Sequence, residues 1–318
     1  MATYLDRYLA GERVEVWNEL IALGDAVRRK PVQVAATRVA DEIMRRARQN
    51  IETLIARLSA MGYRFAAPAI ERELAQIDKQ ISEPPVNSYG YRRIQEAVAE
   101  GKMPASALDL KDNPAYQAMV AQLRKQKIPL MAELERTATM PPIENPRVYY
   151  EPEPGTEKHF KTIEKVTKGP LPLSLRSWYR QVGYVSFVGS HPVLNPDGVA
   201  TADPLLVRPV AEILMGVPIV SLVAENMEDL DRARRNGKTA FTLSTNDLSK
   251  AGLAGGMPYR FWLPEASADV ELRNLWRQTT FVGYLRHAFE WGGFPGWERD
   301  PSPPRDLIGE LTQGLLPI

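Results

Sequence analysis

The sequence of 318 residues contains no cysteine and three histidines. The lack of cysteine excludes disulfide bonds, thiolate metal sites and cysteine nucleophiles, and it is typical of proteins that work in a reducing cytosol. Three histidines leave few nitrogen ligands for a metal ion. The sequence therefore predicts no metal site, and it contains no pattern that predicts a cofactor.

The chain also lacks an excess of charge and a long apolar run. Lys and Arg number 40 against 39 Asp and Glu, which leaves a net charge of +1. A balanced charge does not require nucleic acid or an anionic membrane as a partner. No stretch reaches the roughly 18 apolar residues of a membrane span, and the first residues, MATYLDRYLAGERVEVW, carry charges where a signal peptide is apolar. We therefore expect a cytoplasmic protein without nucleic-acid or membrane partners.

Helical periodicity dominates the first part of the chain. Residues 3–60 predict helices, and the longest of them runs from after Pro31 to Ala60. Its apolar residues recur at spacings of three and four, which indicates one buried face, and Gly62 lies just beyond its end. The members of this apolar stripe are Val39, Ile43, Ala47, Ile51, Leu54 and Leu58. We expect this helix to be the spine of an N-terminal helical domain.

Glycine and proline interrupt the next stretch frequently. The helices predicted between these breakers are 68–81, 92–100, 115–125 and 129–136. The stretch 140–155, MPPIENPRVYYEPEPG, contains five prolines and is typical of a stiff connector. We therefore divide this half into a helical domain at 1–140 and a proline-rich linker at 141–155.

Residues 169–190, GPLPLSLRSWYRQVGYVSFVGS, predict a helix followed directly by a strand. Pro170 and Pro172 lie where a helix can begin but cannot continue, and Gly183 supplies a left-handed residue that ends it. After this glycine the apolar spacing changes from helical to alternating, which is typical of a strand. We expect this unit to be the nucleus of a second domain.

Strands and a closing helix follow this nucleus. The predicted strands are 205–210, 238–244 and 259–263, with a further strand or hinge at 219–224. The predicted helices are 227–236, 269–276 and 280–291. This order is typical of an α+β domain with a mainly antiparallel sheet. We place that domain at 156–300, and a proline-rich tail follows at 301–318.

A glycine-rich turn and a polar loop both invite a chemical interpretation. Gly255 and Gly256 follow Lys250, whereas a phosphate-binding loop places its lysine after the glycines, so we expect a tight bend here. The loop 191–203 is the second candidate, because His191, Asp197 and Asp203 could bind a metal or act on a substrate. Its segment Asn195-Pro196-Asp197-Gly198 is explained equally well as a turn. No G-x-S-x-G elbow occurs, and we predict no catalytic residue.

Aromatic residues gather near the end of the predicted α+β domain. Trp291, Phe294 and Trp297 alternate with glycine and proline, so their rings could lie on an irregular surface that binds a partner. The alternative is a core built of aromatic side chains. His287 is expected at the surface or at an interface, because it lies between Arg286 and Glu290 in the predicted helix.

The segment LPLSLRSWYRQVGYVSFVG resembles the opening of SUKH-superfamily domains, in which a proline-led helix of the form LPxxLxxFYxxxG runs into the first strand. The stretch 246–256 and the closing helix at 280–286 are similar in order to the rest of that fold. The resemblance covers about residues 160–297, and TFVGYLRHAFEWGGFPGW also resembles a group of bacterial proteins. It implies a binding module, since many bacterial SUKH domains are immunity proteins that sequester toxins. It supplies no catalytic residue.

We therefore predict a non-enzymatic protein-binding module, in the specific form of an immunity protein that occludes a toxin. The predicted contacts combine aromatic anchors with a charged rim: Tyr184, His191, Asp247, Lys250, Trp291 and Trp297. One alternative is a small-molecule hydrolase or nucleotide-binding enzyme that uses the loop 191–203. Another is a self-assembling structural protein in which the helical half drives oligomerisation.

Overall fold

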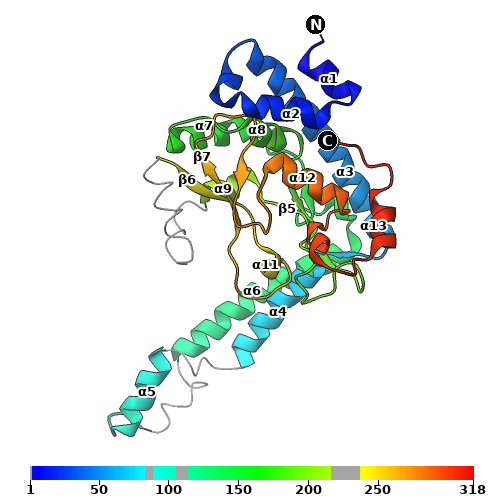
Figure 1. The fold of residues 1–318 in the computed structure, drawn as a ribbon. Coiled ribbons are helices and arrows are strands. Elements are labelled where there is room, and N and C mark those ends of the chain that lie inside the picture. Colours follow the sequence, from blue (N-terminus) through cyan, green and yellow to red (C-terminus); the bar gives the residue numbers. More distant parts are fainter. Residues whose placement is uncertain (1, 83–88, 105–113, 216–236) are drawn as a thin grey trace. The chain divides into compact units, whose positions relative to one another are not determined.

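The computed structural model has the α+β class predicted from the sequence, with a large helical N-terminal region followed by small antiparallel sheets (Figure 1). The residues that it describes are 2–82, 89–104, 114–215 and 237–318. The strand or hinge predicted at 219–224 and the helix predicted at 227–236 lie outside these residues.

Contacts divide the chain into two compact units whose boundaries differ from those of the predicted domains. One unit combines Met1–Phe65 with Pro141–Ile318, and the other consists of Ala66–Met140. The predicted linker at 141–155 therefore lies where the chain returns to the first unit, and the predicted helical domain 1–140 is divided after residue 65. The physical reason is that the longest N-terminal helix buries much of its apolar face against the α+β part of the chain.

That longest helix is the spine of the first unit. The helices at the N-terminus are α1 (Tyr4–Ala10), α2 (Arg13–Ala22), η1 (Gly24–Arg28) and α3 (Val32–Ala60). All six residues of the predicted apolar stripe of α3 are buried. α3 packs against α8 (Leu173–Gln181), and the Ser177 hydroxyl donates a 2.7 Å hydrogen bond to Asp41 at their contact. The predicted spine is confirmed, but it belongs to the same unit as the sheets.

The predicted nucleus is confirmed as α8 followed by β3 (Tyr184–Ser186). Gly183 has φ 85° and its Cβ would lie 2.7 Å from the carbonyl oxygen of Tyr150, so only glycine suits this helix end. Trp178 is buried and meets Phe281 edge to face at 5.4 Å. The remaining helices among the described residues of this unit are η4 (Pro142–Glu144), α7 (Thr156–Thr167), α9 (Val210–Met215), α11 (Asp247–Lys250), α12 (Phe281–Glu290), η6 (Pro295–Arg299) and α13 (Arg305–Thr312).

The strands described in this unit pair antiparallel in four small sheets, β1-β4, β2-β3-β5, β6-β7 and β8-β9. Their bounds are β1 (Arg64–Phe65), β2 (Tyr149–Tyr150), β3 (Tyr184–Ser186), β4 (Gly189–Ser190), β5 (Leu206–Val207), β6 (Thr239–Ser244), β7 (Tyr259–Leu263), β8 (Glu271–Leu272) and β9 (Thr279–Thr280). β6 and β7 form the longest pair, in which Phe241 opposes Phe261 and their rings stack at 5.9 Å. The strands predicted at 238–244 and 259–263 are confirmed.

One prediction for the C-terminal part is wrong. The stretch 269–276 forms β8 and a turn instead of a helix, because Glu271 and Leu272 pair with β9. The proline-rich tail predicted at 301–318 contains the helix α13, and its Leu311 is fully buried. The closing helix predicted at 280–291 is confirmed as α12.

The second unit contains α4 (Ala67–Ser82), α5 (Tyr89–Ala99) and α6 (Pro114–Thr139). α6 continues through Pro129, so the separate helices predicted at 115–125 and 129–136 are one helix. Proline removes one main-chain hydrogen bond, but the turns on either side keep theirs. The Tyr116 hydroxyl donates to the Ile81 carbonyl at 2.8 Å, and Lys127 contacts Asp78 at 2.6 Å, so α4 and α6 run antiparallel.

Candidate functional site

Two tryptophans and a histidine gather where α12 ends. Trp291 directly follows α12, Trp276 lies in the turn between β8 and β9, and His287 lies in the last turn of the helix. The ring centroids of Trp276 and Trp291 lie 5.6 and 6.3 Å from that of His287. α12 starts at this place because the Thr280 hydroxyl accepts a 3.2 Å hydrogen bond from the Gly283 amide.

Charged side chains surround the histidine. Arg277 donates to His287 Nδ1 at 3.1 Å, since a guanidinium can only donate, and it lies 3.3 Å from Glu298. The other ring nitrogen, Nε2, lies 3.2 Å from Glu298, and Glu290 is 3.6 Å from Nδ1. His287 thus accepts a hydrogen bond from Arg277 and has two glutamates close to its ring, and it is 6% exposed. The sequence predicted it at the surface or at an interface, and in the single chain it is buried.

Two arginine side chains, Arg277 and Arg299, pack against the ring of the exposed Trp276. The guanidinium carbons of Arg277 and Arg299 lie 5.5 and 5.6 Å from the centre of the Trp276 ring, which is the geometry of cation–π contacts. Arg299 also contacts Asp247 of α11 at 3.0 Å. Trp276 is 37% exposed and Trp291 is half-buried, so both keep surface that can touch another molecule. We call these residues the Trp276 cluster: Asp247, Trp276, Arg277, His287, Trp291, Glu298 and Arg299.

A buried ion pair anchors α11 beneath the cluster. Lys250 Nζ lies 2.6 Å from Asp203 Oδ1, and both side chains are buried. The Tyr259 hydroxyl donates to the other oxygen of Asp203 at 2.8 Å. Burial, together with the charge of Asp203, raises the pKa of Tyr259 far above its usual range, so this hydroxyl stays a donor. α11 is therefore fixed from below while its Asp247 reaches Arg299.

Trp297 anchors the other side of the cluster. It is 8% exposed, and its Nε1 donates to the Leu194 carbonyl at 2.9 Å. Next to it, a Cβ on Gly296 would lie 2.0 Å from the Thr201 carbonyl oxygen, so η6 packs directly on the loop that precedes β5. Because η6 is held in this way, Glu298 and Arg299 have fixed positions.

No family model, curated protein or solved structure was found to match the chain. Among the residues that the structure describes, no group of three or more histidine, aspartate or glutamate side chains is placed to hold a metal ion. None of the described helices is long and apolar enough to cross a lipid bilayer.

The structure separates the six contacts predicted from the sequence. Asp247 and Trp291 belong to the Trp276 cluster. Lys250 and Trp297 support it from below but are buried, so they leave the set of surface contacts. The remaining two predicted residues, Tyr184 and His191, belong to other parts of this unit.

Tyr184 and His191 have structural partners of their own. The ring of Tyr184 stacks on Tyr150 at 4.8 Å, and its hydroxyl donates to the Arg147 carbonyl at 3.1 Å. His191 Nδ1 accepts from the amides of Val193 and Leu194 at 3.2 and 3.1 Å, which closes a turn. These contacts explain both residues without a ligand, and Asp203 of the same loop is explained by Lys250.

Five members of the cluster were not predicted as contacts: Trp276, Arg277, His287, Glu298 and Arg299. Trp276 was assigned to a helix and Arg277 directly follows it, so the turn that presents both residues was not predicted. Glu298 and Arg299 directly follow the aromatic run that ends at Trp297, and that adjacency was the available signal. The neighbours of His287 predicted a surface or interface residue, and its burial was not predictable because it depends on side chains from three separate segments.

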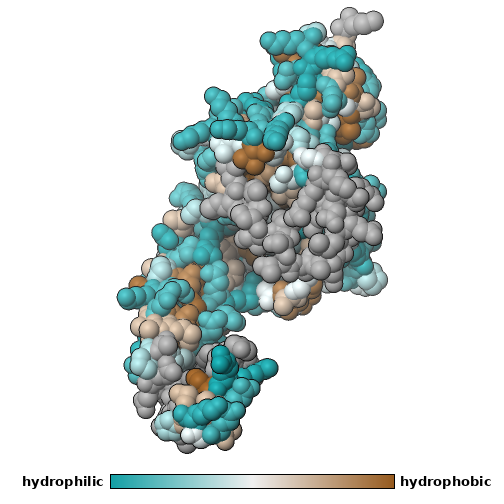
Figure 2. Space-filling model, turned by 90° about the vertical axis from the view of Figure 1, so that its left-hand side faces the viewer, coloured by the Kyte–Doolittle hydropathy of each residue, from teal (hydrophilic) through white to brown (hydrophobic). Residues whose placement is uncertain are grey.

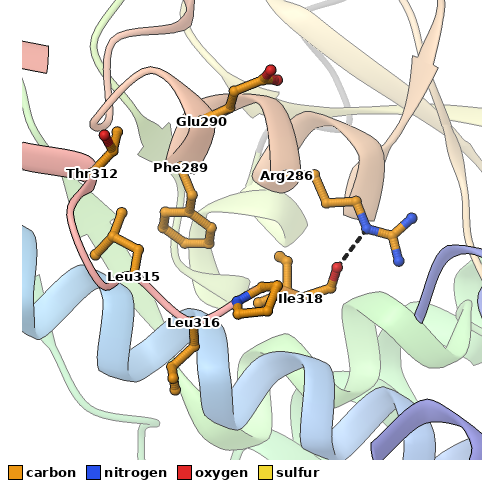
Figure 3. Close-up of a pocket in the computed structure, with 8 residues that line it drawn as sticks. Arg286, Phe289, Glu290, Thr312, Leu315, Leu316 and Ile318 are labelled. Carbon is orange, nitrogen blue, oxygen red and sulfur yellow. Dashed lines mark hydrogen bonds between the residues drawn. The ribbon is translucent and has the colours of Figure 1, made fainter. Parts of the chain in front are cut away.

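A pocket of about 460 Å³ lies between α12 and the segment that follows α13 (Figure 3). Its lining residues are Arg286, Phe289, Glu290, Thr312, Leu315, Leu316, Pro317 and Ile318. Arg286 Nε donates to the main-chain oxygen of Ile318 at 2.7 Å, and its Nη2 to the Arg13 carbonyl at 3.2 Å. Burial lowers the pKa of Arg286. Because main-chain oxygens already engage this guanidinium, its role in the pocket is to hold the C-terminal segment.

Proposed function

We propose that this chain is a non-enzymatic, cytoplasmic protein-binding module and that the Trp276 cluster is its contact surface. The observation that carries the proposal is the pairing of exposed tryptophan with arginine on a rigid frame. Trp and Arg are the residue types most enriched at binding hot spots. The cytoplasmic assignment is supported by the absence of cysteine.

The rigidity of the cluster supports the proposal further. Trp276 and Trp291 both contact His287, which itself accepts a hydrogen bond from Arg277 and lies 3.2 Å from Glu298. Side chains that are ordered before binding lose less conformational entropy when a partner docks. A surface of this kind can bind a protein without rearrangement.

The charges of the cluster suggest what kind of surface the partner has. Arg299 is paired with Asp247, and Arg277 with Glu298, so acidic and basic groups alternate around the rings. A partner with a central apolar side chain and a rim of both charges would complement this arrangement. The chain would then act by covering the partner's functional surface.

An immunity protein that occludes a toxin is the specific form that we propose. It is supported by the resemblance of 171–189 to the opening of SUKH domains and by the α+β class of the chain. The aromatic and charged surface is consistent with tight binding to one protein.

Affinity capture with purified chain from the lysate of its source cells tests the proposal. We expect one stoichiometric partner, and about thirtyfold weaker binding by Trp276→Ala, which is a hot-spot loss. Val166→Ala is the matched control, since Val166 is 52% exposed but lies outside the cluster. If the partner is a toxin, the wild-type chain inhibits it and the Trp276→Ala chain does so poorly. Equal capture by both variants, or recovery of the bait alone, would contradict the proposal.

A further inference from the structure

Helix α6 exposes an apolar pair that nothing in its own unit covers. Ile128 is 69% exposed and Met131 is 50% exposed. Figure 2 shows hydrophobic surface among hydrophilic side chains in the part of the molecule where Figure 1 draws α4 and α6. The two residues are three positions apart and therefore lie on one face of the helix.

This face is not the one that contacts α4. Tyr116 and Lys127 make the contacts with α4, and Met119, Leu123 and Leu130 share their side of the helix at spacings of three and four. At about 100° per residue, the face of Ile128 and Met131 lies roughly a quarter-turn away from that seam. The hairpin thus covers one side of α6 in part and leaves an adjacent side open.

The residues along the open face form a palindrome. Continuing from Ile128 and Met131 at spacings of three and four, the exposed residues of this face are Ala121, Arg124, Ile128, Met131, Glu135 and Ala138. We call them the α6 face. Counted outward from the midpoint between positions 129 and 130, the residues match in pairs. Apolar Ile128 matches apolar Met131, Arg124 matches the oppositely charged Glu135, and Ala121 matches Ala138. A helix face with this symmetry is complementary to its own copy when the two run antiparallel.

The charges of Arg124 and Glu135 favour the antiparallel orientation over the parallel one. In an antiparallel pair Arg124 faces Glu135 of the other copy, and Ile128 faces Met131. In a parallel pair Arg124 would face Arg124, and Glu135 would face Glu135, which is repulsive. Neither Arg124 nor Glu135 takes part in an ion pair within the part of the chain that the structure describes. Both are therefore available to a second copy.

The second unit also has little core of its own. The buried side chains of α4 are Pro68, Ile70 and Ile77, and no α6 side chain that the structure describes is buried. Helices in water are stabilised mainly by packing of an apolar face. Two such hairpins together form a four-helix arrangement with a shared core.

We propose that the α6 face pairs antiparallel with the α6 face of a second copy of this chain and makes the protein a homodimer. The dimer contact lies entirely in Ala66–Met140, whereas the Trp276 cluster lies in the other unit. The two proposals use different residues, so either can fail without the other.

Sedimentation velocity on the full chain, over a range of concentrations, tests the dimer. We expect the wild-type chain to be dimeric and Met131→Glu to raise the dimer dissociation constant about a hundredfold, because the substitution buries a carboxylate at the centre of the contact. Val166→Glu is the control, since Val166 is 52% exposed and lies in the other unit. It should leave the dimer intact. A monomeric wild-type chain, or a dimer that Met131→Glu does not weaken, overturns the proposal.

Charge reversal tests the antiparallel orientation. Arg124→Glu and Glu135→Arg should each weaken the dimer about tenfold, because each places like charges opposite one another. The double variant Arg124→Glu/Glu135→Arg should restore it. These positions are exposed in the single chain, so folding is not at risk, and circular dichroism verifies this. A double variant no tighter than the single ones overturns the antiparallel pairing.

Discussion

The ion pair between Asp203 and Lys250 makes the stability of the fold depend on two single side chains. Both groups are buried, at 1% and 0% side-chain exposure, and Tyr259 shares the carboxylate. Two charges that leave water together need each other, because removal of one leaves the other desolvated and without a counter-charge. A lysine predicted for a partner interface is instead a determinant of stability.

Lys250→Met should lower the free energy of unfolding by about 3–5 kcal/mol, since it leaves the Asp203 carboxylate buried without a cation. The measurement is urea unfolding at neutral pH. Lys238→Met is the matched control, because Lys238 pairs with Glu265 while 38% exposed, and its loss should cost less than about 1 kcal/mol.

Asp203→Asn in the Lys250→Met background should recover part of that loss, since no unpaired charge then remains. Asn is a suitable replacement because position 203 has φ 47°, a left-handed conformation that asparagine tolerates. Equal losses of unfolding free energy for Lys250→Met and Lys238→Met would show that burial of the ion pair does not increase its contribution to stability.

Buried tyrosines give the protein a specific sensitivity to alkali. Burial raises the pKa of Tyr149 to about 12, and it also raises the pKa of other tyrosines: Tyr8, Tyr150, Tyr179, Tyr184, Tyr259 and Tyr284. In the unfolded chain these groups lose their protons near pH 10, whereas in the folded chain they keep them to higher pH. The unfolded state then binds fewer protons, so the stability falls as pH rises through this window.

We therefore expect the urea midpoint to be constant from neutral pH to about pH 9 and to fall steeply above about pH 10. The tyrosinate absorbance of the buried tyrosines should appear together with the loss of the near-UV circular dichroism signal that reports tertiary structure. A full tyrosinate signal from a chain that is still folded would contradict the burial of these side chains.

The C-terminal segment shows how side chains of one element can hold the main chain of another. Asn50 of α3 donates to the Leu316 carbonyl at 2.8 Å and accepts from the Leu316 amide at 2.7 Å. Arg57 adds a 2.6 Å hydrogen bond to the Leu311 carbonyl. The segment after α13 is therefore attached to α3 through its main chain.

Asn50→Ala should release this segment, because both main-chain groups of Leu316 lose their partner. Hydrogen exchange of the Leu316 amide should accelerate about thirtyfold, the equivalent of about 2 kcal/mol. Gln49→Ala, one position away and exposed, should leave the exchange unchanged. Slow exchange in Asn50→Ala would mean that other contacts hold the segment.

Several elements follow from local sequence, and others do not. α8 and its end at Gly183 were predictable because proline and glycine act on the few residues beside them. β6 and β7 were predictable because their alternation is regular. β8 was not, since its two residues are defined by hydrogen bonds to β9 and not by their own pattern. The continuity of α6 through Pro129 likewise depends on packing against α4.

The first unit depends on segments far apart in the chain. Trp17 Nε1 donates to Asp269 at 3.1 Å, and the Tyr63 hydroxyl donates to the Phe187 carbonyl at 2.6 Å. α3 also covers α8. The α+β part is therefore completed by N-terminal helices, and residues 150–318 alone lack a large part of their core.

Residues 150–318 expressed alone should fail to show a cooperative thermal transition, because the surface that α3 covers would be exposed. A chain in which 66–140 is replaced by a flexible Gly/Ser linker should keep a cooperative transition, since Met1–Phe65 and Pro141–Ile318 form one compact unit. Differential scanning calorimetry compares the two. Cooperative unfolding of 150–318 would show that the N-terminal helices are dispensable.

The candidate site was predictable only in part, because some of its residues carry a local signal and others are brought together by distant segments. Trp291 and Asp247 stood out because aromatic and charged residues beside glycine or in a turn are exposed in most folds. Their partners Trp276, Arg277 and His287 come from a turn and a helix whose approach no local pattern encodes. Whether Trp297 faces solvent or Leu194 could not be predicted from its neighbours either.

The sequence by itself determined the α+β class, the apolar stripe of α3, the helix α8 with its glycine end and the strands β6 and β7. Each of these depends on spacing and on conformational preferences that act within a few residues. Tertiary structure alone decided that α3 joins the sheets in one unit, that Lys250 is buried with Asp203, and that Trp276 meets His287. These outcomes depend on which surfaces exclude water together, and that is a property of segments distant in the chain.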